Sequence, residues 1–228
     1  MESDFKIYPS TLPEKDYWRQ VKRTVHGVPV SDEQIMMIVQ AIRGELGLNI
    51  GGQDILLDLG CGNGALSALL FDSISGFHGV DYSEFLISVA QRDFQNEPGF
   101  TFSLGDVLEY VQREQEPSRY SKALCYGCFS YFPDPDGLLK ILNHRFVNLE
   151  SIFIGNLPDR NLAHLFYKDG LPVETEMLDY DSKIGVWRTR EQFSALALRN
   201  GWEAKFSVMP TNFYASHYRY DVLLTRKL

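Results

Sequence analysis

Short apolar runs alternate with amphipathic stretches between residues 54 and 155. The apolar runs have the length and composition of buried strands, whereas the amphipathic stretches repeat their apolar residues at helical spacing. We predict strands at 54–59, 76–80, 99–104, 121–126 and 150–155, and helices at 64–73, 83–95, 106–113 and 135–147. This alternation predicts an α/β fold in which helices cover both faces of a parallel sheet.

The flanking regions contain further elements. Residues 14–24 predict a short helix, and Ser31 with Gln34 resembles a capping box that opens a second helix through about Leu46. Near the other end, the pattern predicts a helix from Thr189 or Arg190 to Asn200, followed by strands at 202–208 and 218–225.

These patterns divide the chain into two regions. Residues 1–52 form an N-terminal helical segment, which is either a packing appendage or a lid over a ligand. Residues 53–228 form the core, with a substrate-side insertion at about 157–188 that does not follow the alternation. A long irregular insertion in a compact domain is usually functional or mobile.

Three alternate glycines follow the first predicted strand, at positions 60, 62 and 64. Glycine lets the backbone turn sharply and approach a ligand closely, and a predicted helix begins directly afterwards. Asp58 ends the first strand, and Asp81 ends the second, where a carboxylate can accept hydrogen bonds from ribose hydroxyls. The sequence therefore predicts a nucleotide-binding corner.

The same corner is compatible with a second chemistry. Gly60, Gly62 and Ala65 also satisfy the dinucleotide fingerprint in its Gly/Ala form, so an NAD(P)-dependent oxidoreductase with a Rossmann site is an alternative. Asp58 has no role in that fingerprint. A non-catalytic member of the fold, which binds a cofactor or a protein, is a further alternative, because a fold does not fix a function.

Three segments resemble the class I S-adenosylmethionine-dependent methyltransferases. The segment from Asp58 to Gly64 resembles their first motif, 79–83 their second and 104–107 their third, in the same order and with similar spacing. The resemblance is close over roughly residues 50–155 and holds only in outline elsewhere. It implies a doubly wound, Rossmann-like sheet of seven mostly parallel strands, with an antiparallel last strand inserted between its neighbours. It also implies S-adenosyl-L-methionine as cofactor.

The resemblance also implies roles for individual residues. Asp58 would favour the α-ammonium group of the cofactor, Asp81 would bind both ribose hydroxyls, and Asp106 would accept from the adenine amino group. For Asp106 a helix N-cap is an alternative role, and one residue can serve both. On the predicted lid, Tyr17 and Trp18 would cover the sulfonium, and Lys22 or Arg23 would meet a carboxylate. The predicted cofactor-binding residues are Asp58, Gly60, Cys61, Gly62, Gly64, Asp81, Tyr82, Asp106, Val107, Cys125, Tyr17 and Lys22.

The segment 125–133 bears on the methyl acceptor. It lacks the Asn/Asp-Pro-Pro-Tyr/Phe sequence of methyltransferases that act on DNA bases or on glutamine, and it resembles the small-molecule branch instead. We therefore expect methyl transfer to oxygen or nitrogen of a small-molecule metabolite. No spacing singles out the residues that bind it; the candidates are Tyr131, Asn156, Tyr214 and Arg219.

A general base is needed only if the acceptor keeps its proton until attack, as an alcohol does. His217, His164 and His26 fall on segments near the expected pocket and are the candidate catalytic residues. His217 has the best position, at the start of the last predicted strand. His78 lies in the second strand region, where a structural role is expected.

Composition narrows the range of partners. The chain has 22 Lys and Arg against 30 Asp and Glu, a formal net charge of −8, which argues against nucleic acid because phosphate contacts need basic clusters. No apolar run reaches the length of a membrane span, and the N-terminus lacks a signal-peptide core. Nothing in the sequence indicates the oligomeric state.

The three cysteines, Cys61, Cys125 and Cys128, form no disulfide framework, so we expect a cytoplasmic protein. Cys125 and Cys128 make a single C-x-x-C without a second ligand pair, and we predict no metal site.

Overall fold

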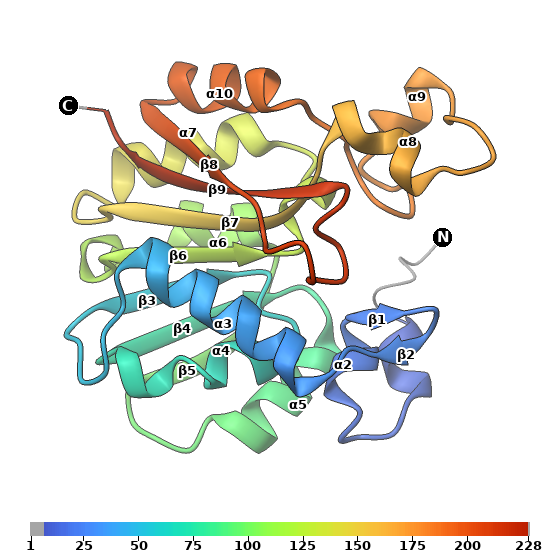
Figure 1. Ribbon diagram of the computed structural model, residues 1–228. Helices are drawn as coiled ribbons and strands as arrows, with labels where there is room; N and C mark the ends of the chain where they lie inside the picture. Colours follow the sequence, from blue (N-terminus) through green and yellow to red (C-terminus); the bar gives the residue numbers. More distant parts are fainter. Residues whose placement is uncertain (1–6, 228) are drawn as a thin grey trace.

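The computed structural model describes residues 7–227, and its centre is a seven-stranded sheet (Figure 1). The strands lie in the order β5-β4-β3-β6-β7-β9-β8. β3 to β7 are parallel, and β9 is inserted antiparallel between β7 and β8, which confirms the predicted Rossmann-like sheet. The bounds are β3 (Ile55–Leu59), β4 (Gly76–Asp81), β5 (Phe100–Leu104), β6 (Lys122–Tyr126), β7 (Ser151–Pro158), β8 (Trp202–Ser207) and β9 (Arg219–Arg226).

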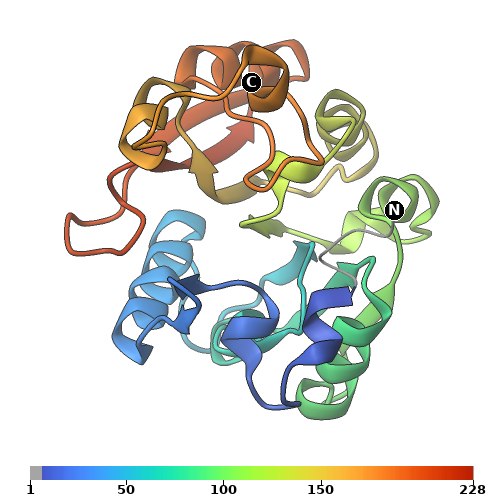
Figure 2. The same ribbon diagram turned by 90° about the vertical axis from the view of Figure 1, so that its right-hand side faces the viewer.

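Helices cover both faces of the sheet, as predicted (Figure 2). α6 (Val107–Arg113), α7 (Pro135–Arg145) and α10 (Arg190–Arg199) bury their apolar residues in one core cluster. The second cluster takes those of α3 (Asp32–Leu46), α4 (Ala65–Ala68) and α5 (Glu84–Phe94). Both clusters draw on the strands between them, so the sheet is the buried middle layer.

Polar caps fix where several helices begin. Thr189 and Gln192 form a reciprocal capping box at α10. At α3 the Ser31 hydroxyl accepts from the Gln34 backbone at 3.4 Å, as predicted. The Gln34 side chain does not complete the box, because it donates to the Asn212 carbonyl and accepts from the Tyr214 backbone instead. This side chain therefore ties α3 to the loop before β9.

The predicted helix over 14–24 is wrong in extent. α2 covers only Tyr17–Gln20, and β1 (Thr24–Val25) and β2 (Val28–Pro29) then form a small antiparallel hairpin. The two residues between these strands, His26 and Gly27, both have positive φ, which is the backbone of a tight hairpin turn. β-Branched residues on either side favour strands over a helix.

The predicted helix over 64–73 is also shorter than expected. It divides into α4 and the 3₁₀-helix η2 (Phe71–Ser73). The remaining short 3₁₀-helices are η1 (Tyr8–Thr11), η3 (Pro117–Arg119), η4 (Phe129–Tyr131) and η5 (Arg160–Leu162).

The insertion between β7 and α10 contains α8 (Ala163–Phe166) and α9 (Glu174–Met177) joined by irregular chain. Ala163, Met177 and Trp187 give it a small apolar cluster of its own. In Figure 1 it projects beyond the carboxyl ends of the parallel strands, on the same side as α2 and the hairpin. Every helix within residues 7–227 is too short or too polar to cross a membrane.

A bulge interrupts β7 at this same edge of the sheet. The pairing of β7 with β9 shifts register between Ile154 and Leu157. Asn156 lies in the bulge with φ of 65°, and its backbone N–H donates to the Asp221 carboxylate at 2.6 Å. Bulges at sheet edges commonly redirect side chains towards a functional site.

Candidate functional site

The glycine loop after β3 is packed against two distant parts of the chain. Gly60 and Gly62 have φ of 84° and 57°, in the left-handed region that favours glycine. A Cβ on Gly60 would lie 2.6 Å from the Cys128 sulfur, and one on Gly62 would lie 2.9 Å from Val21. The loop is therefore closed on one side by the segment after β6 and on another by the N-terminal segment.

Asp58, at the end of β3, is a buried carboxylate beneath this loop. It is only 3% exposed and accepts a hydrogen bond from the Ser67 hydroxyl. Burial raises its pKa to about 7, because the charged form loses water; the Ser67 bond opposes this shift and the negative charge of Asp81 adds to it. A cation placed beside Asp58 would stabilise the charged form.

Asp81, at the end of β4, faces the same loop. Its carboxylate accepts from the Gly62 backbone at 3.0 Å and from the Ser83 backbone at 2.9 Å. Burial raises its pKa, and these backbone donors limit the rise. The two contacts fix the carboxylate beside the loop while leaving acceptor capacity for hydroxyl groups of a ligand.

The N-terminal segment is joined to the glycine loop by buried hydrogen bonds. The Asn63 side-chain amide donates to the Gln20 side chain at 2.9 Å and to the Tyr17 carbonyl at 2.8 Å. Gln20 in turn donates to the carbonyls of Pro13 and Glu14. The segment thus covers the loop through contacts that the sequence pattern did not indicate.

Arg23 extends from this segment over the carboxyl end of β6. Its guanidinium carbon lies 5.3 Å from the centre of the Tyr126 ring and 5.6 Å from that of Trp18. Its positive charge also lowers the pKa of Asp58, which places the two groups within electrostatic reach. A carboxylate and a guanidinium therefore face the loop together, an arrangement that suits a zwitterion.

A second polar cluster lies beside the loop, at the ends of β6 and β7. The Tyr126 hydroxyl and the Asn156 side-chain oxygen are both buried and have no hydrogen-bond partner among the described residues. The Arg219 guanidinium donates to the Asn156 carbonyl and lies 4.8 Å from the centre of the Tyr218 ring. Because buried polar atoms normally have partners, this cluster is built to receive a ligand group or water.

Asp221 completes this cluster from β9. It is 3% exposed, and burial raises its pKa to about 6. Its charge acts on the Tyr126 hydroxyl, whose pKa is raised well above its usual value, chiefly by burial. Asp221 is still ionised at neutral pH, so it can accept a proton there.

Over residues 51–187 the chain matches the family model of the methyltransferase domain. The chain belongs to this methyltransferase family. Membership confirms the resemblance seen in the sequence and the prediction of S-adenosylmethionine as cofactor. It argues against the alternative hypothesis of an NAD(P)-dependent oxidoreductase.

Individual relatives are more distant. The methyltransferase is 27% identical over 143 residues to the ubiquinone biosynthesis O-methyltransferase of Pseudomonas aeruginosa, a match that spans 58% of this chain and 61% of that protein. The corresponding enzyme of Pseudomonas fluorescens is 24% identical over 119 residues, or 52% and 50% of the two chains. The chain thus spans about half to three fifths of the length of these relatives.

Two solved structures share its fold. Magnesium protoporphyrin IX methyltransferase from Synechocystis PCC 6803, with bound SAH, superposes with a TM-score of 0.64 at 17% identity and covers 98% of this chain and 97% of its own. A cyclopropane synthase from Mycobacterium tuberculosis gives 0.61 at 12% identity, with coverage of 95% and 99%. At these identities the likeness shows the fold alone.

The predicted adenine end of the methyltransferase site combines a cap with a small cavity. Asp106 accepts from the Glu109 backbone at 3.0 Å as the N-cap of α6, so its alternative role is present. It also lines a cavity of about 50 Å³ together with Val107 and Phe132. The Val107 side chain is buried in the core, which leaves its backbone for a ligand. Tyr82 is 40% exposed after β4.

Several predicted cofactor-binding side chains contact other parts of the protein. The Tyr17 hydroxyl donates to Asp93 on α5 at 3.0 Å, so its side chain is directed to that helix while its carbonyl meets the loop. The Lys22 ammonium lies 5.3 Å from the centre of the Tyr8 ring. Cys61 and Cys125 are buried, and Cys125 lies 3.1 Å from the sulfur of Cys128. Their roles at the cofactor stay predictions.

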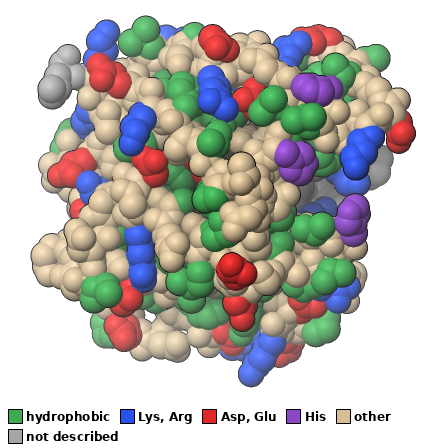
Figure 3. Space-filling model, viewed as in Figure 1, with side chains coloured by type: hydrophobic (Ala, Val, Ile, Leu, Met, Phe, Trp, Pro, Cys, Tyr) green, Lys and Arg blue, Asp and Glu red, His purple; other side chains and the backbone are tan. Residues whose placement is uncertain are grey.

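The three predicted catalytic histidines are all exposed side chains on separate segments. His26 lies in the hairpin turn, His164 on α8, and His217 in the loop before β9, with its ring 4.8 Å from that of Tyr218. Figure 3 shows histidine side chains at the surface on this side of the molecule. The structure gives none of them a buried acidic partner. His78 is structural, as expected, since its ring bonds Thr101 and Ser103.

Tyr126 and Asp221 are missing from the predicted site residues, whereas Arg23 is predicted as an alternative to Lys22. Tyr126 lies in β6, an apolar strand whose pattern gives no sign of a functional role. Asp221 lies in β9, which is also mostly apolar and runs antiparallel to its neighbours. Only the insertion of β9 beside β7 brings them to one edge. Among residues 7–227, no group of acidic, histidine and cysteine side chains is arranged to hold a metal ion.

Proposed function

We propose that this methyltransferase transfers the methyl group of S-adenosylmethionine to an oxygen or nitrogen atom of a small-molecule metabolite. The observation that carries the proposal is the adjacency of two sites. The glycine loop, with Asp58 and Asp81, suits the cofactor, and the unpartnered polar atoms of Tyr126 and Asn156 lie at the next strand ends. An acceptor held there would lie beside the donor.

The residues around the loop suit the parts of the cofactor. Asp58 and Arg23 match the α-ammonium and the α-carboxylate, and Asp81 matches the ribose hydroxyls. Asp106, Val107 and Phe132 border the place of the adenine. The bound cofactor supplies an activated methyl group, so the protein has to orient the acceptor and exclude water.

Residues 7–30 serve as the lid in this proposal. The buried bonds of Asn63 to Gln20 and Tyr17 hold the segment against the glycine loop. A lid that covers the loop excludes water from the reacting atoms. The insertion at 159–188 would wall the acceptor from the other side.

An oxygen acceptor is supported by two observations. The curated relatives are named as O-methyltransferases. In this chain, Asp221 is a buried carboxylate beside Tyr126 and is ionised at neutral pH, so it can take the proton that a hydroxyl acceptor must lose. We therefore place the general base at Asp221, acting on the acceptor directly or through Tyr126, rather than at the exposed histidines.

The test begins with thermal unfolding in the presence of S-adenosylmethionine, S-adenosylhomocysteine or NADH. A ligand at about 100 times its dissociation constant adds roughly 2.7 kcal/mol of stability, so only true ligands shift the transition by several degrees. We expect both sulfur ligands to stabilise the protein and NADH to have no effect. Stabilisation by NADH alone would overturn the proposal.

The acceptor is then sought with labelled cofactor and a panel of phenols, carboxylic acids and amines. Transfer of label to a hydroxyl or amino compound would support the proposal. Asp221→Asn should abolish transfer to a hydroxyl acceptor while leaving the stabilisation by S-adenosylhomocysteine unchanged. Wild-type rates in that variant would rule out Asp221 as the base.

A further inference from the structure

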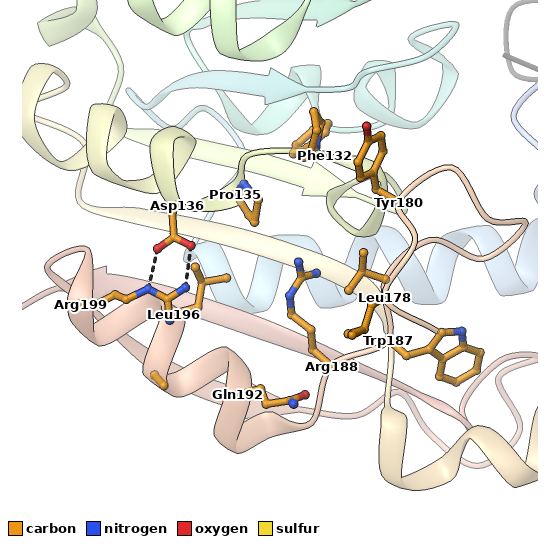
Figure 4. A pocket seen from close by; sticks show the side chains of 13 residues that line it. Phe132, Pro135, Asp136, Leu178, Tyr180, Trp187, Arg188, Gln192, Leu196 and Arg199 are labelled. Carbon is orange, nitrogen blue, oxygen red and sulfur yellow. Dashed lines mark hydrogen bonds and ion pairs between the residues drawn. The ribbon is translucent and has the colours of Figure 1, made fainter. Parts of the chain in front are cut away.

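A cavity of about 420 Å³ lies apart from the cofactor loop, between α7, α10 and the end of the insertion (Figure 4). It shares no lining residue with the cluster of Tyr126, Asn156 and Asp221. Its volume falls within the usual range for small-molecule sites. The proposed methyl transfer does not require this cavity, so its lining residues indicate a separate function.

The Arg188 side chain projects into this cavity. Figure 4 shows its guanidinium between the Asp136–Arg199 pair on one side and Leu178 and Tyr180 on the other. Its Nη1 atom is buried and has no hydrogen-bond partner, and its side chain makes no ion pair with another residue in the described range 7–227. The residue as a whole is half-buried, and an unpartnered buried N–H of a charged group is costly because it has lost water without gaining an acceptor.

The neighbouring carboxylates are already engaged. Asp136 accepts from Arg199 at 2.5 and 2.6 Å and from Asn200 at 2.9 Å. Asp159 accepts from the Asn161 backbone at 3.0 Å and pairs with Arg190 at 3.3 Å. The protein therefore supplies pairs for Arg190 and Arg199 and leaves Arg188 without one.

The backbone of Arg188 is held in place. Its carbonyl accepts from the Arg160 backbone at 3.2 Å and from the Tyr220 hydroxyl at 3.3 Å, and its N–H donates to Pro158. Burial lowers its pKa from the usual value, which is consistent with a charge that lacks a partner. The first turns of α7 and α10 also line the cavity, and the amino ends of helices favour negative charge.

Part of the remaining wall is apolar. Phe132, Leu178, Val186 and Leu196 line the cavity around the guanidinium. Leu178 is 49% exposed, a large apolar surface at the rim. A small inorganic anion would satisfy Arg188 but would leave this surface uncovered. The chemistry fits a ligand with one anionic group and an apolar body.

We propose that this cavity is a binding site for an organic anion, in which Arg188 pairs with a carboxylate or phosphate group and Phe132 and Leu178 contact the apolar part. Phe132 also borders the small cavity beside Asp106, and it lies 3.9 Å from the position of a Cβ on Gly60. The occupant is therefore separated from the cofactor loop by a single ring. The site stands independently of which acceptor is methylated.

The test uses thermal unfolding and titration calorimetry with benzoate and phenyl phosphate as probes. Benzamide is the neutral counterpart, and inorganic phosphate is the anion without an apolar body. We expect benzoate or phenyl phosphate to bind and stabilise the protein, with benzamide and inorganic phosphate weaker by about tenfold or more. Equal effects of benzoate and benzamide, or binding by none of the probes, would overturn the proposal, as would equal effects of inorganic phosphate.

Two pairs of variants locate the binding. Arg188→Leu should lose the anion-dependent shift, whereas Arg113→Leu, the same charge change at an exposed position on α6, should keep it. A purely structural Arg188 would instead lose stability without affecting the probes. If Arg188→Leu does not fold, Leu178→Glu at the exposed rim places a competing carboxylate beside Arg188. Leu178→Glu should abolish binding of benzoate and phenyl phosphate, whereas Leu178→Gln should retain it.

An assay with labelled S-adenosylmethionine then tests whether the bound anion is itself methylated. Binding without label would show a ligand site separate from the acceptor, and label in the bound anion would place the acceptor in this cavity rather than at Tyr126 and Asn156. Either result supports the site. Because S-adenosylhomocysteine binding is measured separately, failure of the anion site does not count against the methyltransferase reaction.

Discussion

The side chains of Asn63 and Gln20 are 43 positions apart in the chain and hydrogen-bond at 2.9 Å in a buried setting. Asn63 belongs to the glycine loop, and Gln20 is the last residue of α2. Gln20 is also bound to the carbonyls of Pro13 and Glu14, so one amide side chain links residues 13–14 to the glycine loop. This pair joins the predicted lid to the predicted cofactor loop.

Disruption of that pair should weaken retention of the cofactor. Asn63→Ala leaves the buried side-chain oxygen of Gln20 without its donor, which costs about 1–3 kcal/mol. We expect faster dissociation of S-adenosylhomocysteine, measured by stopped-flow fluorescence, with a smaller change in its association rate. Asn96→Ala, on the surface after α5, serves as the control and should behave as wild type. An unchanged dissociation rate in Asn63→Ala would show that the segment is not a lid.

Replacement of Asp81 should reduce cofactor affinity. Its carboxylate is positioned for two hydroxyl groups, and hydrogen bonds to charged groups are worth about 1.5–3 kcal/mol each. We expect Asp81→Asn to bind S-adenosylmethionine about tenfold to a hundredfold more weakly by calorimetry. The Asn side chain has one acceptor oxygen, so it can keep the bond from either the Gly62 or the Ser83 backbone but not both, and circular dichroism checks that the variant folds. Affinity within twofold of wild type would contradict the assigned role.

The raised pKa of Asp58 predicts a dependence of stability on pH. Its pKa rises from 3.8 to about 7 on folding, so the folded protein binds more protons than the unfolded chain between these values. The free energy of unfolding should therefore fall as pH rises from about 4 to 7, by at most about 1.4 kcal/mol per pH unit from this group. Urea unfolding of wild type and Asp58→Asn measures the difference. Asp221, with a pKa of about 6, contributes equally to the pH dependence of stability in both proteins, so it does not affect the difference between them.

Binding of the cofactor should show the opposite pH dependence, because its α-ammonium group stabilises ionised Asp58. We expect affinity for S-adenosylmethionine to decrease as pH falls below about 7 in wild type and to be flatter in Asp58→Asn. Parallel pH profiles in the two proteins would exclude Asp58 from cofactor binding.

Tyr126→Phe separates a structural from a functional role of the buried hydroxyl. That hydroxyl has no partner within the described chain, so its removal should leave stability unchanged or raise it slightly. Methyl transfer should nevertheless fall by about tenfold or more if the hydroxyl binds the acceptor or its proton. Tyr110→Phe on α6, whose hydroxyl lies 2.7 Å from that of Tyr120, serves as the control and should keep wild-type turnover. A loss of stability with normal turnover would assign Tyr126 to the core alone.

Several features could be predicted because they depend on short stretches of chain. Alternating apolar runs determine the strands and helices, and the spacing of Asp58, the glycines and Asp81 reflects local backbone geometry at the ends of β3 and β4. Asp106 could be recognised as a cap because its bond reaches only three residues along. The errors also have local causes: the helix over 14–24 gave way to a hairpin whose turn at His26 and Gly27 resembles no strong turn signal.

What the sequence determined by itself is the fold class, the methyltransferase family and its cofactor, because contiguous motifs encode them. The tertiary structure alone decided that Asn63 meets Gln20, that Asp221 acts electrostatically on Tyr126, and that the Nη1 atom of Arg188 has no partner within residues 7–227. Each of these depends on segments that are distant in the chain and are brought together by the sheet order. Pairing and desolvation act through space, so no pattern of neighbouring residues can specify them.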